Sequence, residues 1–216
     1  MLVLEETPLY TLNKYITPTN EFDYEEYCDA QNVMTMSKPT RVWTCEENIQ
    51  FIANYIKSRI EPKFGVCHGT RTGAEQQWFM KHIHGCDVIG TEISEVADTA
   101  PNTIKWDFHK VKPEWIDAVD FIYTNSFDHT YNPEECLNAW ISCLRRNGLC
   151  IIEYVDYKEG IIDHTAADAF RTTLQFLPYL VLMWADGRYG VTRIVNTPKM
   201  KNGTLYQVMV VIERFR

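Results

Sequence analysis

The segment FGVCHGTRTGAEQQWF, residues 64–79, decides the fold that we predict for this chain. It begins as an apolar strand, passes through a turn between Gly69 and Gly73, and continues as a helix. Glycine allows backbone dihedral angles and close approaches that a side chain forbids, and the amides at the start of a helix favour an anionic ligand. Two glycines four residues apart are a weak signal alone, because many such turns only connect a strand to a helix. The role of this loop therefore has to be inferred from the strands and turns on its C-terminal side.

Composition narrows the class of protein. With 216 residues, of which 45% are hydrophobic and 23% charged, the chain is long enough for one large domain with a substantial core. Its formal charge of −8 and its pI near 5.3 disfavour a nucleic-acid partner, since such binding depends on clustered Lys and Arg. A small-molecule or protein substrate fits this composition better.

Cysteine usage and the start of the chain predict a cytoplasmic protein. The seven cysteines are scattered and form no C-x-x-C pair, which argues against a disulfide framework and a zinc ribbon. No basic segment precedes the short apolar start, so no secretory signal is expected. The longest apolar run, residues 176–184, is far shorter than the roughly 20 residues of a membrane-spanning helix, so no membrane partner is expected. We predict no metal site, because His82 and His84 lack a second ligand cluster. A homodimer is one possible assembly.

The chain divides at about residue 45. Residues 1–44 are rich in Tyr, Thr, Asn and acidic residues, contain one short helical pattern around residues 21–30, and are predicted to form an N-terminal extension or cap. Residues 45–216 are predicted to form a single α/β domain. It starts with a helix that has Thr44 as its N-cap and that places one face of apolar residues together: Ile49, Ile52, Ala53, Ile56 and Ile60.

Short apolar runs then alternate with helical patterns. The sequence predicts strands at residues 64–67, 87–92, 104–106, 120–124 and 149–154, with helices at 73–83 and 133–144. This alternation indicates a doubly wound, mostly parallel sheet with helices on both faces. Residues 163–177 are predicted to be helical. The last 26 residues predict a C-terminal antiparallel hairpin with its turn at Asn202 and Gly203.

Polar residues come directly after four successive strands, at the sheet edge where open parallel sheets bind ligands. The loop from Gly69 to Gly73 comes after the first strand, and the second strand ends at Glu92. Asp107 comes after the third strand, and the run from Asn125 to His129 after the fourth.

These positions resemble the class I S-adenosylmethionine-dependent methyltransferases. Residues 120–154, DFIYTNSFDHTYNPEECLNAWISCLRRNGLCIIEY, are similar to the fourth to sixth motifs of that family, and the resemblance extends over roughly residues 60–154. It implies S-adenosyl-L-methionine as cofactor, with Glu92 accepting hydrogen bonds from the ribose and Asp107 from the adenine amino group. Phe108 or Trp106 would lie against the ring. The implied cofactor-binding set is Gly69, Thr70, Arg71, Gly73, Glu92, Ile93, Asp107, Phe108, Asn125, Ser126 and Phe127.

The glycine loop departs from the family pattern at two positions. Arg71 stands where the middle glycine is expected, and Cys67 stands where a carboxylate is expected two residues before the first glycine. Arg71 could donate two parallel hydrogen bonds to the carboxylate of the cofactor, or its side chain could fill the site.

Several site residues have two interpretations. Glu92 could cap the next helix, and Asp107 could only terminate a strand. Asp128 and His129 are candidate catalytic residues, since His titrates near neutral pH, but a structural or substrate-contact role is equally consistent with the sequence. A set of residues after the last parallel strand could shape an acceptor pocket or cap a helix: Glu153, Asp156, His164 and Asp168. The aromatic N-terminal segment could cover the acceptor or pack on the sheet flank.

The predicted function is a methyltransferase that acts on a small-molecule acceptor. A non-catalytic protein that uses the same sheet as an interaction scaffold is the alternative, because fold does not establish function. A nicotinamide-dependent oxidoreductase ranks last, since Gly69-Thr70-Arg71-Thr72-Gly73 does not supply G-x-G-x-x-G.

Overall fold

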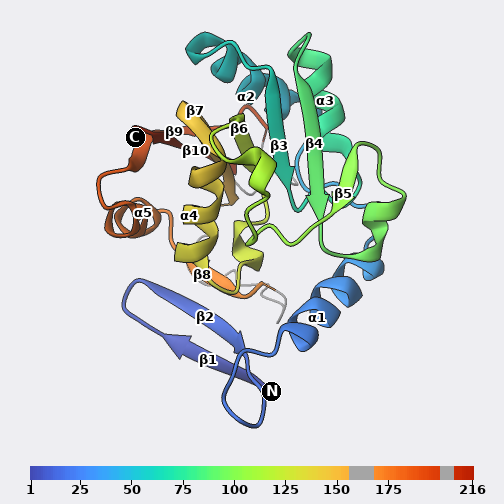
Figure 1. The fold of residues 1–216 in the computed structure, drawn as a ribbon, viewed down its shortest axis with the longest axis vertical. Coiled ribbons are helices and arrows are strands. Elements are labelled where there is room, and N and C mark those ends of the chain that lie inside the picture. The colour runs from blue at the N-terminus through green and yellow to red at the C-terminus, as the bar shows by residue number, and fades with distance from the viewer. Residues whose placement is uncertain (156–167, 200–206) are drawn as a thin grey trace.

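A seven-stranded sheet forms the centre of the molecule in the computed structural model, which describes residues 1–155, 168–199 and 207–216 (Figure 1). The strand order is β5-β4-β3-β6-β7-β10-β9. Five strands run parallel: β3 (Phe64–His68), β4 (Asp87–Glu92), β5 (Thr103–Lys105), β6 (Val119–Thr124) and β7 (Leu144–Val155). β10 (Gln207–Arg214) is antiparallel to both β7 and β9 (Tyr189–Asn196). The predicted doubly wound sheet with a C-terminal antiparallel pair is confirmed, and the predicted turn at Asn202 and Gly203 lies outside the described residues.

Helices cover both faces of this sheet. α2 (Glu46–Arg59) and α3 (Ala74–His82) pack on one face, whereas α4 (Pro133–Cys143) and α5 (Leu177–Ala185) pack on the other. The two faces alternate along each strand: Phe121 and Tyr123 face α2 and α3, while Ile122 faces α4 and α5. All six residues of β6 are buried, as expected of a central strand covered on both sides.

Local signals explain where two helices begin. α4 starts at Pro133, in the first turn where proline is tolerated, and the Asn132 side chain accepts a hydrogen bond from the backbone N–H of Glu135. α2 starts at Glu46 after Cys45, which has extended dihedral angles and makes no side-chain capping bond. The prediction of Thr44 as the N-cap is wrong, because Thr44 lies one residue too early and is buried.

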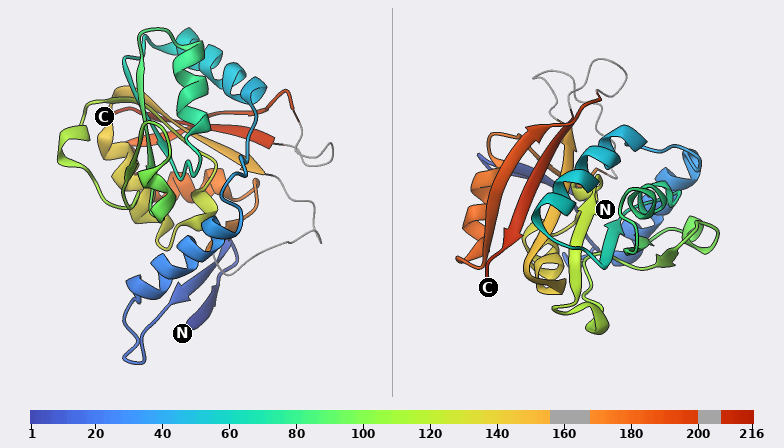
Figure 2. Two further views of the ribbon diagram at one scale, coloured as in Figure 1. Left: turned by 90° about the vertical axis from the view of Figure 1, so that its right-hand side faces the viewer. Right: turned by 90° about the horizontal axis from the view of Figure 1, so that it is seen from above.

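Residues 1–44 contain more structure than the sequence pattern indicated. Strands β1 (Leu2–Glu6) and β2 (Tyr10–Tyr15) form a hairpin, and β8 (Phe170–Thr172) pairs with β2 to complete a three-stranded antiparallel sheet. The predicted helix at residues 21–30 is present as the longer α1 (Tyr24–Ser37), capped by Asp23. The hairpin and α1 lie beyond the carboxyl ends of β3 and β4 (Figures 1 and 2).

The helix predicted at residues 163–177 is wrong where the structure describes the chain. Phe170–Thr172 form β8, and the helix α5 begins only at Leu177. Edge pairing with β2 fixes β8 as a strand, and Pro178 suits the first turn of a helix rather than its end. Residues 163–167 lie outside the described residues.

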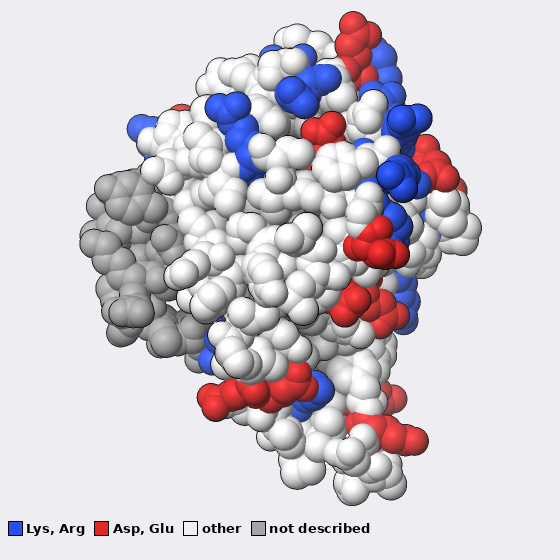
Figure 3. Space-filling view, turned by 90° about the vertical axis from the view of Figure 1, so that its left-hand side faces the viewer, with Lys and Arg blue, Asp and Glu red and all other residues white. Residues whose placement is uncertain are grey.

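In the part of the chain that the structure describes, three short 3-10 helices occupy connections: η1 (Glu95–Asp98), η2 (Pro113–Trp115) and η3 (Phe127–His129). On the outer surface of α5, the side chains of Tyr179, Leu182 and Met183 are exposed. Figure 3 shows the side of the molecule that is on the left in Figure 1, and the middle of this face carries few charged side chains.

Within the described ranges, no helix combines the length and apolarity needed to cross a bilayer.

The packing of β3 against β6 leads to a first prediction. A Cβ added at Gly65 would overlap the ring of Phe121, which is fully buried. We expect Gly65→Ala to lower the free energy of unfolding by about 1–3 kcal/mol, the usual cost of overpacking, measured by urea denaturation. In a Phe121→Ala background the same substitution should cost clearly less, and an equal cost in both backgrounds would contradict the proposed overlap.

Candidate active site

The glycine loop connects β3 to α3 and lies against the turn after β6. Gly69 and Gly73 have φ values of +69° and +76°, in the left-handed region that favours glycine. A Cβ at Gly69 would lie 2.6 Å from both Cβ and Oγ of Ser126. Arg71 also has a positive φ, +45°, which is uncommon for a residue with a side chain. The loop therefore approaches the β6 turn as closely as its backbone allows.

Glu92 ends β4 and holds this loop. One carboxylate oxygen accepts a hydrogen bond from the backbone N–H of Arg71 at 3.1 Å. The other accepts from the backbone N–H and the hydroxyl of Ser94, at 2.9 and 2.8 Å. A carboxylate has about four acceptor positions, so one remains for a further donor. The ribose contact of Glu92 stays a prediction.

Asp107 is the hub of a buried polar cluster. Its carboxylate accepts from the backbone N–H of His109 at 3.0 Å and pairs with Nδ1 of the same residue at 2.8 Å. The hydroxyls of Tyr24 and Tyr131 donate to its other oxygen at 3.0 and 3.3 Å. Burial acts to raise the pKa of Asp107, but the hydrogen bonds from His109 and Tyr24 and the charge interaction with His109 outweigh it and lower the pKa. An adenine contact stays a prediction and would require Tyr24 to give way.

The tautomer of His109 is set by its partners. Its Nε2 accepts from the backbone N–H of Tyr131 at 3.2 Å, so Nδ1 carries the proton and donates to Asp107. The imidazole stacks on the Tyr131 ring with centroids 3.6 Å apart. Burial lowers the pKa of His109, which keeps it neutral at pH 7. These contacts fix the positions of Asp107, His109 and Tyr131 relative to one another.

A cleft brings together most of the predicted cofactor-binding residues. It has a volume of about 30 Å³ and adjoins a hollow of about 380 Å³ that shares Ile93 and Asp107 with it. Trp106 lines the hollow, whereas Phe108 lines the cleft. The residues around the cleft are Tyr27, Gln31, Thr35, Gly69, Arg71, Glu92, Ile93, Asp107, Phe108, Ser126 and His129. Thr70 and Gly73 do not line it: Thr70 is buried beneath the loop, and Gly73 lies against Pro101.

The α1 side of the cleft was not predicted in detail. Tyr24, Tyr27, Gln31 and Thr35 occur at intervals of three or four residues, which places them on one face of a helix. The Tyr27 hydroxyl donates to the backbone oxygen of His129 at 3.1 Å. The helical spacing of these side chains is visible in the sequence. Their contacts with residues more than 80 positions away are not.

Arg71 occupies the cleft with part of its hydrogen-bonding capacity unused. Its Nη1 donates to the backbone oxygen of Arg41 at 3.3 Å, while the buried Nε has no hydrogen-bond partner among the described residues. Burial lowers the pKa of Arg71, against the opposing effect of the Glu92 and Glu75 carboxylates. A partly buried guanidinium whose buried Nε–H has no partner in the described part of the chain fits a ligand carboxylate at this position.

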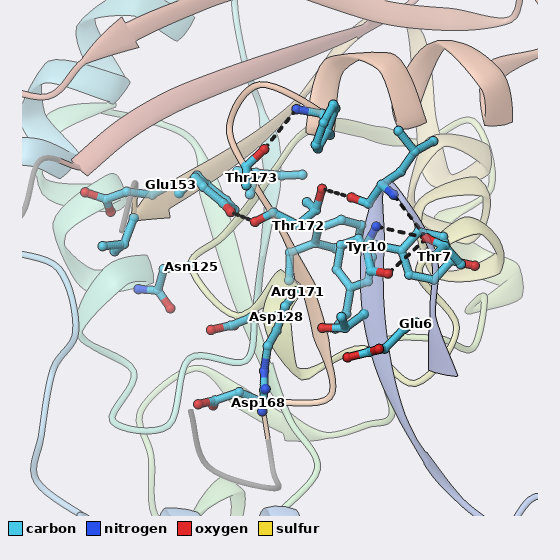
Figure 4. Close-up of a pocket in the computed structure, with 18 of the residues that line it drawn as sticks. Glu6, Thr7, Tyr10, Asn125, Asp128, Glu153, Asp168, Arg171, Thr172 and Thr173 are labelled. Carbon is cyan, nitrogen blue, oxygen red and sulfur yellow. Dashed lines mark hydrogen bonds between the residues drawn. The ribbon is translucent and has the colours of Figure 1, made fainter. Parts of the chain in front are cut away.

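A second cavity of about 520 Å³ lies at the carboxyl ends of β6 and β7, closed by the β1–β2 hairpin and β8 (Figure 4). Its lining comprises Leu4, Glu6, Thr7, Pro8, Leu9, Tyr10, Thr11, Trp43, Asn125, Phe127, Asp128, Ile152, Glu153, Tyr154, Val155, Asp168, Phe170, Arg171, Thr172, Thr173 and Phe176. Glu153 and Asp168 line this cavity, as in the first of the two interpretations of these residues, in which they shape an acceptor pocket. Asp156 and His164 lie outside the described residues.

The turn after β6 separates the cleft from this cavity. Ser126 and His129 line the cleft, whereas Asn125, Phe127 and Asp128 line the cavity. His129 Nε2 lies 3.8 Å from a carboxylate oxygen of Asp128 and 3.8 Å from one of Asp168. Ligand atoms of these three residues lie within 4.8 Å of one another, which would suit a metal ion, so the absence of a metal stays a prediction.

Beneath the loop, Glu75 joins the glycine loop to the β6 turn. The Thr70 hydroxyl lies 2.8 Å from Oε2 of Glu75 and 2.6 Å from Oε1 of Gln76, yet it has one proton to donate. The Gln76 amide nitrogen donates to Thr103 Oγ1, which leaves its oxygen facing Thr70. Thr70 can therefore donate to only one of these oxygens at a time, and a proton on Glu75 would satisfy the other contact. Burial raises the pKa of Glu75 to about 7, and Asn125 Nδ2 lies 3.3 Å from its other oxygen.

Comparison with known proteins agrees with this architecture. No family model and no curated protein sequence matches the chain. Among solved structures, 1,6-didemethyltoxoflavin-N1-methyltransferase from Burkholderia thailandensis, with bound 1,6-didemethyltoxoflavin and S-adenosylhomocysteine, superposes with a TM-score of 0.70 at 13% identity over 99% of both chains. The chain has the class I methyltransferase fold.

Other structures with this fold differ in their named reactions. A SAM-dependent methyltransferase from Aquifex aeolicus matches with a TM-score of 0.57 at 15% identity, over 90% of this chain and all of that one. The [4+2]-cyclase SpnF matches with a TM-score of 0.61 at 10% identity, over 88% and 94% of the two chains. The class I methyltransferase fold is thus shown, and the reaction has to be argued from the site.

Cys67 shows how this chain departs from the methyltransferase pattern. It is buried in the apolar cluster beneath α2 and α3, near Phe79 and Phe121. Burial raises the pKa of its thiol well above the usual value, so the side chain is neutral. The charge that the resemblance expects at this position is absent from residue 67.

The raised pKa of Glu75 predicts the direction in which the free energy of unfolding changes with pH. Because the pKa is raised from 4.5 to about 7 in the folded state, folding is favoured less as pH rises through this interval, and the full cost remains above pH 7. Gln cannot ionise, and its amide can donate to Thr70. At pH 8, Glu75→Gln should raise the free energy of unfolding by up to about 3 kcal/mol; at pH 4 the two proteins should be nearly equal.

Urea denaturation at both pH values measures this difference. The matched control is Glu61→Gln, which changes an exposed carboxylate just before β3 and should show no such pH dependence. A Glu75→Gln protein that is less stable than the wild type at pH 8 would contradict the raised pKa of Glu75.

Proposed function

We propose that this protein is an S-adenosylmethionine-dependent methyltransferase that acts on a small molecule. The observation that carries the proposal is the turn after β6, from which Ser126 and His129 line the cleft while Asn125, Phe127 and Asp128 line the cavity of about 520 Å³. Methyl transfer requires a donor and an acceptor to meet at one boundary, and this turn provides one.

The residues of the cleft are suited to the proposed cofactor. Glu92 would hold the ribose, Ile93 and Phe108 would flank the adenine, and Arg71 would pair with the carboxylate of the methionine portion. When bound, the cofactor supplies a methyl group on a sulfonium, which a nucleophile can displace directly. The chain contributes chiefly by holding the acceptor in line with that methyl group.

The acceptor would occupy the cavity under the β1–β2 hairpin, with Asp128 as a catalytic residue at its wall and His129 as a second one on the side of the cleft. Burial raises the pKa of Asp128, and the Asp168 charge adds to this effect while His129 opposes it. A carboxylate whose pKa is raised is a stronger base, so it is better suited to take a proton from the molecule that is methylated. The 1,6-didemethyltoxoflavin-N1-methyltransferase, whose structure covers 99% of this chain, was solved with the small molecule 1,6-didemethyltoxoflavin bound, which supports a small-molecule acceptor here.

The alternative is a non-catalytic or differently active protein with the same fold. α1 leaves only about 30 Å³ in the cleft, and Asp107 is engaged by residues of the chain itself. These two observations favour the alternative if α1 does not move.

Cofactor affinity tests the proposal. We expect isothermal titration with S-adenosylhomocysteine to give heat of binding, and Glu92→Ala to weaken binding by about 1–3 kcal/mol through the loss of a charge-assisted hydrogen bond. Thermal unfolding of the variant controls for misfolding. Absence of binding to the wild type at high micromolar ligand would refute the proposed function.

The role of Arg71 can be separated from that of Glu92. S-Adenosylhomocysteine contains the amino-acid carboxylate, whereas 5′-methylthioadenosine lacks it. Arg71→Ala should weaken binding of the first ligand and leave binding of the second nearly unchanged, while Glu92→Ala should weaken both. If Arg71→Ala instead improves both affinities, Arg71 fills the cleft, and the scaffold alternative is favoured.

A further inference from the structure

We propose that the acceptor is an amine carried on an apolar body, and that it is methylated on nitrogen with Asp128 as the proton acceptor. This inference rests on the proposed function, because it names the acceptor class for the same site.

The body of the acceptor is indicated by the walls of the cavity. Most of the lining is apolar or aromatic, and it comes from the N-terminal hairpin, from β7 and from the segment around β8 (Figure 4). A cavity of about 520 Å³ lies in the size range of small-molecule sites. The apolar walls therefore suit a ring or a hydrocarbon portion.

The polar part of the acceptor is indicated by charge. Four carboxylates line the cavity, Glu6, Asp128, Glu153 and Asp168, and among the described lining residues they face one cation, Arg171. Arg171 extends from β8 past Asp128 toward Asp168, and both carboxylates act on its pKa. Glu153 is hydrogen-bonded to Tyr123 and Asn48. A negatively charged ligand would be repelled by this excess of carboxylates, whereas a positively charged ligand would be attracted to it.

Asp128 is the carboxylate placed to receive that cation. Its buried Oδ1 has no hydrogen-bond partner among the described residues, while 44% of the side chain is exposed. It stands on the same turn as Ser126 and His129, which line the cleft. An ammonium group on Asp128 would therefore lie beside the boundary between donor and acceptor.

The reaction balances without a further reactant. The bound ammonium gives one proton to the Asp128 carboxylate and becomes a neutral amine. Its nitrogen lone pair forms a bond to the methyl carbon as the carbon–sulfur bond breaks, and the electron pair of that bond stays on sulfur. The products are the methylated ammonium and S-adenosylhomocysteine, and Asp128 later releases its proton to water.

Two matched probes test the charge preference. Tryptamine and indole-3-propionate share an indole ring and a two-carbon chain but end in an ammonium and a carboxylate. Titrated into the full chain saturated with S-adenosylhomocysteine and monitored by ligand-observed NMR, tryptamine should bind about tenfold or more tightly. Equal affinities, tighter binding of indole-3-propionate, or binding of neither probe would overturn the inference.

A variant pair assigns the preference to one residue. Asp128→Asn should remove most of the preference for tryptamine, whereas Glu61→Gln, an exposed carboxylate distant from the carboxyl ends of the strands, should retain it. The affinity of each variant for S-adenosylhomocysteine shows that its fold is intact. A folded Asp128→Asn protein that keeps the full preference would exclude Asp128 as the amine-binding group.

The two proposals fail in different ways. If S-adenosylhomocysteine does not bind, the proposed function fails, and the probes titrated without it still report the preference of the cavity. If S-adenosylhomocysteine binds but the carboxylate probe binds more tightly, only the acceptor class is wrong.

Discussion

The contact between the glycine loop and the β6 turn is the constraint on which the rest of the site depends. Thr124 Oγ1 donates to the backbone oxygen of His68, and Ser126 Oγ lies 3.2 Å from the backbone oxygen of Gly69. Since Gly69 has no side chain, the Ser126 side chain can lie directly against the backbone of the glycine loop. This closeness lets one turn form a wall of both the cleft and the larger cavity, so donor and acceptor can share a boundary.

Asp107 extends this constraint to the N-terminal segment. Its carboxylate receives Tyr24 from α1, Tyr131 from the β6 turn and His109 from its own loop. Three separate parts of the chain are thus fixed by one buried anion, and a buried anion has to be hydrogen-bonded to be stable. The same contacts keep α1 over the cleft, so moving α1 away from the cleft would break the hydrogen bond from Tyr24 to Asp107.

The sequence predicted the central sheet because its strands are continuous apolar runs and because each helix has a clear period. It also predicted which strand ends carry polar residues, since Glu92, Asp107 and Asn125 lie directly at the ends of apolar runs. It did not predict β8, because Phe170–Thr172 are held as a strand by β2, some 160 residues earlier. The α1 contacts and the second cavity were not predicted for the same reason. Both are formed by segments that are far apart in the sequence, and no local pattern shows that these segments meet.

The four carboxylates near the β6 turn differ in how their charge is compensated, and this separates structural from chemical roles. Asp107 is ionised and fully hydrogen-bonded, and Glu92 is held by three donors from the chain. Burial raises the pKa of Glu75 to about 7, so protonation near neutral pH reduces the cost of burying its charge. Asp128 alone among these four combines a buried oxygen that has no partner in the described part of the chain with an opening to the cavity. A buried carboxylate oxygen without a hydrogen-bond partner is one that a donor on a ligand can stabilise, and this is why the proposed amine contact is assigned to Asp128.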